Sequence, residues 1–338
     1  MDNKFSIVMQ GSILDKHGRL NSDVIGNIKK IRSVFSTAEF ILSTWKVNED
    51  IKLELEQIIS DYSLVVIYNI DPGCLYSIDG VVSSNVNRMV VSTKNGIKRC
   101  SHNFVIKIRT DSYLYNDNLK KILLKIIDSR INHIRTRDKK IFDDYVINCN
   151  LFARDARGYI PYLFHPGDIC LAGNRTDLLL LFDVPLADNN IFMNISRACF
   201  LSFMRFVPEQ YVWIHCIGNK TGKIPYNGNQ DYNNDLIKTS EIFYANNFIS
   251  MSAEQLGFSW PKYELIYKNK GLHSIYSLNC WKSLYNFNVT NYFAIDKKSL
   301  TLKRLITIVM SAYFFVRTCL LKIPMLRKIA IKLFRQRG

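Results

Sequence analysis

A strand-like run that ends in charged residues is the part of this sequence best suited to chemistry. Residues 104–109 read Phe-Val-Ile-Lys-Ile-Arg, and Thr110, Asp111 and Ser112 follow directly. In a parallel α/β sheet, ligands bind at the carboxyl ends of the strands, where a carboxylate suits a divalent cation or the ribose of a sugar nucleotide. Asp111 is therefore the first candidate functional residue. An Asp at this place also commonly caps the next turn, so the neighbouring elements have to decide between the two roles.

The first 110 residues alternate between strand and helix patterns. Strands are expected at residues 5–10, 38–43, 64–68 and 104–109, and helices at residues 22–34, 49–59 and 84–99, the first of them with Ser22 as its N-cap. This rhythm predicts an open, doubly wound α/β domain with a mostly parallel sheet flanked by helices. The GxGxxG fingerprint is absent after the first strand, which disfavours a typical dinucleotide fold.

Polar residues follow all four of these strands. Because the carboxyl ends of parallel strands lie side by side, the residues are expected to line a single cleft. They are Gln10, Gly11 and Ser12 after the first strand, Thr44 after the second, Asp71 after the third, and Arg109 and Asp111 after the fourth.

The helix at residues 84–99 adds a polar row, since Asn85, Arg88 and Ser92 are spaced to lie on one face. An arginine on such a row can clamp a phosphate with two hydrogen bonds, which suits a donor that carries a diphosphate. The alternative is a solvated helix face with an incidental arginine.

A second chemical cluster lies in the segment Tyr162-Leu163-Phe164-His165-Pro166-Gly167-Asp168. Aromatic residues beside a carboxylate in a turn could stack a sugar ring and take a proton from a hydroxyl group, as general-base catalysis requires. A helix-capping Asp beside core aromatic residues explains the pattern equally well. Glu209, which opens an expected helix at residues 209–217, is the second candidate base, although first-turn acids more often serve the helix dipole. Another helix is expected at residues 192–206.

The C-terminal segment is strongly basic and apolar at once. Residues 301–338 hold nine Lys or Arg and no Asp or Glu, which leaves +7 of the net charge of +16 to the first 300 residues. Nucleic acid would not require so much aliphatic surface between the cations, whereas an amphipathic helix in an anionic leaflet would. The unbroken apolar run, residues 305–316, is shorter than the roughly 20 residues that span a bilayer, so the helix is expected to lie on the membrane. The alternative is a helix that packs on the core of the protein.

The remaining composition places the chain in a reducing compartment. None of the eight cysteines forms a CxxC pair, so neither a disulfide framework nor a zinc site is indicated. The N-terminus runs into a strand pattern without the apolar core of a signal peptide. We therefore expect a cytoplasmic protein, peripheral on the inner face of the cell membrane.

In chain order, several short motifs together resemble the WavE family of lipopolysaccharide-synthesis proteins over roughly residues 4–215. These motifs are Met9-Gln10-Gly11-Ser12, Glu39-Phe-Ile-Leu-Ser43-Thr44-Trp45, Asp71-Pro72-Gly73, Asn85-Val-Asn87-Arg88, Ser92-Thr93-Lys94-Asn95-Gly96, Lys107-Ile-Arg109-Thr-Asp111 and Phe164-His165-Pro166-Gly167-Asp168.

The resemblance implies a GT-A-like fold and a glycosyltransferase. Residues 1–115 would form the half that binds the nucleotide sugar, 116–300 the acceptor-binding half with a helical region, and 301–338 the membrane-associating helix. The acceptor would be a lipid-linked or growing bacterial surface polysaccharide, namely lipopolysaccharide core, O-antigen or capsule. In the GT-A type, a carboxylate that ends a strand handles the donor and its Mn or Mg ion. Here Arg109 occupies the place of the first acid of that element, so Asp111 is the expected metal ligand while Arg109 could neutralise the diphosphate in the cation's place.

The resemblance also assigns roles to the candidate residues. The expected catalytic residues are Asp168 and Glu209; the acceptor-binding residues are Tyr162, Phe164 and His165; and the donor-binding residues are Gln10, Gly11, Ser12, Thr44, Asp71, Asn85, Arg88, Ser92, Arg109 and Asp111. Two rivals stay open: a non-catalytic protein that binds membrane or nucleic acid through its basic tail, and a transferase of another nucleotide-activated group. The low net charge before residue 301 speaks against nucleic acid as a partner.

Overall fold

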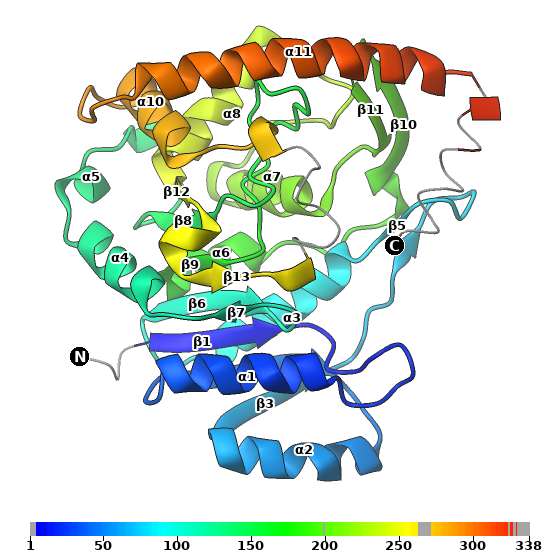
Figure 1. The fold of residues 1–338 in the computed structure, drawn as a ribbon, viewed down its shortest axis with the longest axis vertical. Helices are drawn as coiled ribbons and strands as arrows, with labels where there is room; N and C mark the ends of the chain where they lie inside the picture. Colours follow the sequence, from blue (N-terminus) through cyan, green and yellow to red (C-terminus); the bar gives the residue numbers. More distant parts are fainter. Residues whose placement is uncertain (1–4, 199, 263–271, 324, 327–328, 330–338) are drawn as a thin grey trace.

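A computed structural model describes residues 5–198, 200–262, 272–323, 325–326 and 329. Within them the chain builds one seven-stranded sheet in the order β12-β8-β9-β6-β1-β2-β3, besides three two-stranded pairs (Figure 1). The strands of the large sheet are β1 (Phe5–Gln10), β2 (Glu39–Trp45), β3 (Leu64–Asn69), β6 (Phe104–Arg109), β8 (Val146–Cys149), β9 (Leu171–Asn174) and β12 (Phe248–Met251). The paired short strands are β4 (Leu75–Tyr76) with β5 (Ser83–Ser84), β7 (Tyr113–Leu114) with β13 (Phe258–Ser259), and β10 (Phe192–Arg197) with β11 (Phe200–Met204).

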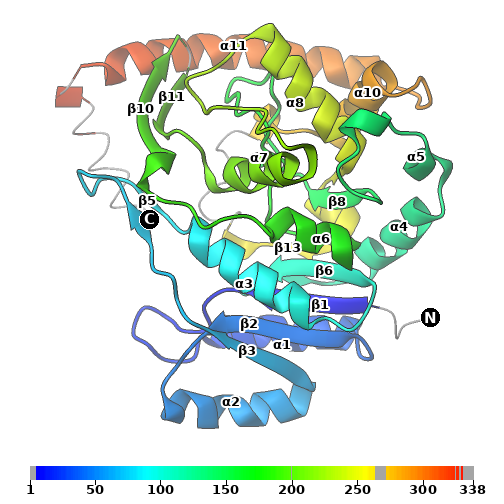
Figure 2. The same ribbon diagram turned by 180° about the vertical axis from the view of Figure 1, so that it is seen from behind.

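Helices connect these strands. They are α1 (Ser22–Val34), α2 (Glu49–Tyr62), α3 (Val86–Arg99), α4 (Asn118–Ile127), α5 (Arg130–His133), α6 (Arg175–Phe182), α7 (Pro208–Thr221), α8 (Asn234–Asn247), α9 (Ala253–Leu256), α10 (Leu278–Asn288) and α11 (Lys297–Leu321). Figure 1 shows α1 on one side of the large sheet, and the reverse view in Figure 2 shows α3 and α6 on the other. The expected open, doubly wound arrangement is therefore confirmed.

Parallel pairing brings the ends of the first strands to one edge of the sheet. β1 pairs in parallel with both β2 and β6, and Gln10 lies opposite Ser43 on one side and Arg109 on the other. The exception in the sheet is β9, which runs antiparallel to β6 and β8. The strand interiors are almost wholly apolar because both faces are covered, as expected for a buried parallel sheet.

Residues 192–206 do not form the helix that their apolar spacing suggests. They form the hairpin β10–β11, in which Ile195 pairs with Ser202 and Arg197 with Phe200. The guanidinium group of Arg197 lies 4.3 Å from the ring centre of Phe200, so cross-strand packing outweighs the helical spacing. The first helix also differs slightly from expectation, since Asn21 rather than Ser22 is its N-cap and accepts a hydrogen bond from the amide of Asp23.

The C-terminal helix is longer than the apolar run that predicted it. α11 has 25 residues and begins at Lys297, before the expected boundary at 301. Among the described helices, α11 is the one that is long and apolar enough to cross a membrane, by length and composition only. Of its most apolar stretch, 6% is buried inside the molecule. The apolar run at 305–316 therefore understated the length of the helix, which by length and composition could also cross a membrane. The helix lies lengthwise across one end of the molecule, beside α8, α10 and the hairpin β10–β11 (Figures 1 and 2). The cations from Arg327 onward fall outside the described residues.

Candidate active site at the strand ends

A cavity of about 320 Å³ opens where β1, β2 and β6 end. It is lined by Gln10, Gly11, Ser12, Asn21, Val24, Trp45, Asn85, Arg88, Met89, Arg109, Thr110 and Asp111. Seven of the ten expected donor-binding residues are in this set. The convergence follows from the parallel register, because residues after neighbouring parallel strands must emerge side by side.

Two arginines in the wall of this cavity each form an ion pair with a carboxylate. Arg88 binds both oxygens of Asp71, with Nε–Oδ1 and Nη2–Oδ2 distances of 2.7 and 2.6 Å. Arg109 binds both oxygens of Asp111 at 2.8 and 2.9 Å in the same two-pronged geometry. A third bond, from Arg88 Nη1 to Asn85 Oδ1 at 3.0 Å, ties the first pair to the start of α3. Asp71 thus reaches the site through Arg88, although it is not part of the cavity wall.

These pairs keep both carboxylates ionised. Hydrogen bonds from Arg88 hold the pKa of Asp71 below its usual value. Burial alone would raise the pKa of Asp111, but the hydrogen bonds and charge of Arg109 outweigh burial and lower it. The guanidinium group of Arg109 also lies 5.3 Å from the ring centre of Trp260, which fixes its plane from the other side.

Two further expected donor-binding residues, Ser92 and Thr44, are buried and do not line the cavity. Ser92 is fully buried, and its hydroxyl donates a hydrogen bond of 2.7 Å to Oε1 of Gln10. Thr44 is 1% exposed and therefore does not reach the cavity, where Trp45 takes its place. Gly11 has a φ of +132°, and a Cβ there would lie 2.8 Å from Oγ1 of Thr110, so this turn requires glycine.

A buried charged cluster acts electrostatically on Arg109. Lys107, in the middle of β6, is inaccessible to solvent, and its Nζ lies 3.0 Å from Oδ2 of Asp168 while also donating to the backbone carbonyl of Asp168. Burial would lower the pKa of Arg109, yet its hydrogen bonds to Asp111 and the negative charges of Asp111, Asp168 and Glu209 raise it overall. The expected catalytic residues therefore act on the same arginine that lines the cavity.

Glu209 is the group in this cluster that is poised to exchange a proton. It stands in the first turn of α7 beside the N-terminal Pro208, and its side chain is 16% exposed. Burial, together with the negative charge of Asp168, raises the pKa of Glu209 to about 7. Asp168 is already engaged by Lys107 in a buried ion pair. The geometry reverses the expected order and favours Glu209 as the base.

The three expected acceptor residues are placed differently from one another. His165 lies 3.5 Å from Glu209 (Nε2 to Oε2), and burial lowers the pKa of His165 to about 3, which keeps the ring neutral. Tyr162 is partly exposed, with its ring centre 5.7 Å from that of His165. Phe164 is 1% exposed and packs against Tyr226, so it contributes to the core and does not offer a stacking face to a sugar.

The expected metal ligand of this site, Asp111, is engaged by an arginine. Among the described residues, no group of three or more His, Cys, Asp or Glu side chains could hold one. Asp111 gives both of its oxygens to Arg109, so the expected metal ligand is already neutralised by a cation.

Two site residues were not singled out from the sequence: Asn21, which lines the cavity, and Lys107, which binds Asp168. Trp45, at the end of β2, lines the cavity as its place after a parallel strand predicts. A signal existed for Lys107, because a lysine in the centre of an apolar strand has to find a buried partner. No comparable signal marks Asn21, which reaches the site from the start of α1.

Comparison with known proteins identifies the family of this chain. A family model described as WavE lipopolysaccharide synthesis matches residues 5–314. Among curated proteins, the hemagglutinin-esterase of human coronavirus HKU1 (isolate N2) is 29% identical over 103 residues, which are 30% of this chain and 27% of that protein. The chain thus spans about a quarter of the length of that relative.

Solved structures resemble the chain only weakly. An active-site mutant of LgtC has a TM-score of 0.35 at 9% identity, over 86% of this chain and 84% of its own. The mannosyltransferase PcManGT from Pyrobaculum calidifontis, solved with GDP-Man and Mn²⁺, has a TM-score of 0.34 at 9% identity, over 55% of this chain and 50% of its own. A cytidylyltransferase from Leptospira borgpetersenii has a TM-score of 0.32 at 11% identity, over 55% and 66%. TM-scores this low do not show which residues of this chain form its site.

Proposed function

This chain belongs to the WavE lipopolysaccharide synthesis family, and we propose that it is a GT-A-like glycosyltransferase. It would move a sugar from a nucleotide-sugar donor to a lipid-linked or growing bacterial surface polysaccharide. The observation that carries the proposal is the strand-end cavity with Arg88 and Arg109 in its wall. These arginines offer a site for a diphosphate, and the buried Glu209, whose negative charge acts on Arg109, is a group that can accept a proton.

The donor's diphosphate is assigned to the two arginines. Arg88 and Arg109 line the same cavity, and each is held in place by a carboxylate, Asp71 or Asp111. A guanidinium group fixed in this way can donate its remaining N–H groups to phosphate oxygens without a further loss of side-chain freedom. Asp71 and Asp111 are therefore positioning residues. The arginines stabilise the negative charge that develops on the nucleoside diphosphate as the bond to the sugar breaks.

The acceptor's proton is assigned to Glu209. As the acceptor oxygen bonds to the anomeric carbon of the donor, the bond from that carbon to the diphosphate breaks, and the hydroxyl proton passes to the carboxylate. A pKa of about 7 suits this step, since a base works best when its pKa is near the working pH. The neutral His165 at 3.5 Å fixes the position of this carboxyl group without neutralising its charge.

Membrane association is assigned to the outer face of α11. Leu305, Val309 and Val316 are 56%, 68% and 57% exposed, and the exposed Arg304 and the partly exposed Arg317 stand on the same helix. An apolar helix face with flanking cations suits the surface of an anionic leaflet. We therefore propose a cytoplasmic protein, peripheral on the inner face of the bacterial cell membrane.

The helix is also tied to the body of the protein, which favours an in-plane orientation over a spanning one. Lys303 is paired with the largely buried Asp155, and its Nζ donates to the carbonyl of Ile275 at 2.8 Å. Turning α11 through the bilayer would break this pair and leave a partly buried carboxylate without its cation, which is costly.

Binding of nucleotide sugars tests the proposed function most directly. A panel of UDP-, GDP-, CDP- and dTDP-sugars is screened for a rise in melting temperature, since a ligand of the folded state stabilises it. The effective donor should lose this rise in Arg88→Ala and keep it in Arg99→Ala, which removes an exposed arginine from the far end of α3. The proposal fails if no nucleotide sugar raises the melting temperature, or if both variants respond equally.

A further inference from the structure

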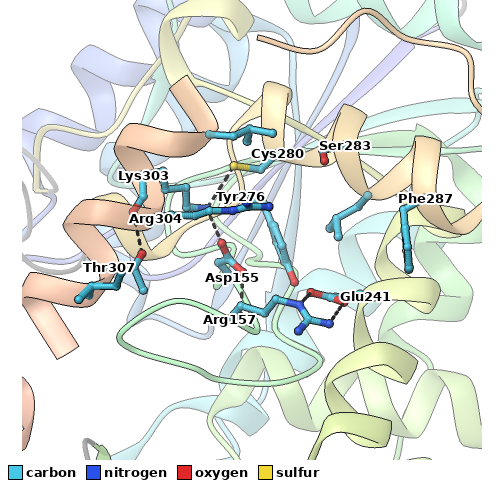
Figure 3. Close-up of a pocket in the computed structure, with 13 residues that line it drawn as sticks. Asp155, Arg157, Glu241, Tyr276, Cys280, Ser283, Phe287, Lys303, Arg304 and Thr307 are labelled. Atoms are coloured by element: carbon cyan, nitrogen blue, oxygen red, sulfur yellow. Dashed lines mark hydrogen bonds and ion pairs between the residues drawn. The ribbon is translucent and has the colours of Figure 1, made fainter. Parts of the chain in front are cut away.

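A second cavity, of about 620 Å³, lies beneath α11 and away from the strand ends. Its walls come from α11, α10, α8 and the loop around Asp155, as Figure 3 shows. This volume is within the range of small-molecule sites in proteins. The proposed transfer chemistry uses none of the residues that line it.

The floor of this cavity is polar and the rim is apolar. At the floor lies the carboxylate of Glu241, whose side chain is only 4% exposed, and the exposed Arg157 donates to both of its oxygens at 2.6 and 2.9 Å. At the rim, Phe287 on α10 is 79% exposed and Ile308 on α11 is 67% exposed. A pocket for a hydrocarbon tail alone would have the opposite arrangement, with an apolar floor and a polar rim. A polar floor below an apolar rim suits a ligand with a polar head group and a hydrocarbon tail that leaves the cavity across Phe287 and Ile308.

Charge at the cavity favours a phosphate as part of that head group. Three cations line it, Arg157, Lys303 and Arg304, against two carboxylates, Asp155 and Glu241. The first two cations are paired with those carboxylates. The exposed Arg304 has no hydrogen-bond or ion-pair partner for its guanidinium group among the residues that the structure describes. Figure 3 shows Arg304 on the α11 wall of the cavity. A free guanidinium group beside apolar surface suits a phosphate that links a polar head to a lipid.

The floor also offers groups that bind sugar hydroxyls. Carboxylate oxygens that already accept one hydrogen bond retain lone pairs for a second, so Asp155 and Glu241 can each accept from a hydroxyl. The backbone at the floor also leads toward the proposed catalytic cluster. Asp155 faces the cavity, whereas the positive charge of its neighbour Arg154 acts on His165 and Glu209. One loop thus separates the two sites.

We propose that this cavity binds the lipid-proximal head of the acceptor, a sugar joined to a lipid through a phosphate. The phosphate lies at Arg304, the sugar hydroxyls lie on Asp155, Arg157 and Glu241, and the hydrocarbon chain leaves across the apolar rim toward the membrane face of α11. The growing end of the glycan is thereby free to reach the strand-end cavity. This inference rests on the proposed function, because it assumes a lipid-linked acceptor.

Two short-chain probes test the site on the full chain. Decyl phosphate and decyl glucoside, each below its micelle concentration, are titrated by calorimetry against the wild type and three variants. Ser283→Trp fills the cavity from α10, Arg304→Ala removes the free cation, and Arg317→Ala removes a partly exposed cation of α11 outside the cavity. A melting curve confirms that each variant is folded.

We expect both probes to bind the wild type with one-to-one stoichiometry. Arg304→Ala should weaken decyl phosphate at least about tenfold and decyl glucoside less than about twofold, since only the phosphate loses a charged partner. Ser283→Trp should weaken both probes, and Arg317→Ala should change neither. Equal losses in the two arginine variants would mean a non-specific attraction to α11 and would overturn the site, as would unchanged binding in Ser283→Trp.

Failure of this site and failure of the proposed function give different results. Nucleotide-sugar binding by Arg304→Ala together with undiminished transfer to a lipid-linked acceptor would reject the cavity while leaving the glycosyltransferase assignment intact. Binding of the probes that depends on Arg304, in a protein that binds no nucleotide sugar, would retain the cavity and reject the transferase.

Discussion

Glu209 is expected to destabilise the folded protein above neutral pH, because its buried carboxyl group must lose its proton there. The pKa of this group rises from 4.5 to about 7 in the folded protein, mainly through burial and then through the charge of Asp168. A rise of this kind means that the folded state holds the proton longer than the unfolded chain does. The loss in the free energy of unfolding that Glu209 causes is therefore absent below about pH 4.5. It grows as the pH rises and is complete above about pH 7.

The size of this effect follows from the shift. About 2.5 pH units at about 1.4 kcal/mol per unit give roughly 3 kcal/mol lost from the free energy of unfolding at pH 8. Glu209→Gln removes the titration. Relative to the wild type, this variant should therefore gain up to about 3 kcal/mol between pH 4.5 and pH 8, while any pH-independent cost of the substitution cancels. Urea unfolding at both pH values measures the difference.

Glu254→Gln is the matched control for this experiment. Glu254 also stands in the first turn of a helix, α9, but it is exposed. Both substitutions remove a charge that favours a helix N-terminus, so only the burial differs. Glu209→Gln should also lower transfer about 100-fold or more, as expected for the loss of a general base. If Glu209→Gln and Glu254→Gln show the same pH dependence of stability, Glu209 titrates normally and the argument for it as the base is refuted.

Other substitutions test the remaining parts of the site and the membrane face. Asp111→Asn should lower transfer at least about tenfold with an unchanged melting temperature, because Arg109 loses the carboxylate that positions it; wild-type turnover would contradict this. Asp168→Asn should lower the free energy of unfolding by about 3–5 kcal/mol in urea titrations, since it leaves the charge of a buried lysine without its ion-pair partner; a loss below about 1 kcal/mol would show that the lysine is otherwise satisfied. Val309→Glu should abolish sedimentation with anionic vesicles at an unchanged melting temperature, whereas Leu53→Glu, at an exposed apolar position on α2, should not. Equal binding by both variants would exclude α11 as the membrane face.

The sheet and the strand-end cavity were predictable because both depend on local patterns. Apolar runs that alternate with amphipathic helices determine a parallel sheet, and a parallel sheet determines that residues such as Gln10 and Asp111 meet at one edge. The hairpin at 192–204 was not predictable in this way. Its apolar residues are spaced as on a helix, and only the pairing of Arg197 with Phe200 across the two strands decides between the structures.

The roles of Asp168 and Glu209 could not be ranked from the sequence, because the ranking depends on partners that lie far away along the chain. Asp168 meets Lys107, 61 residues earlier, through a turn before β9 that the sequence does not place relative to β6. That pairing fixes Asp168 as a structural anion and leaves its charge beside Glu209, whose pKa it raises. A first-turn glutamate is usually a solvated partner of the helix dipole. Here the packing of α7 against the loop of Asp168 turns such a residue into an acid that holds its proton up to neutral pH.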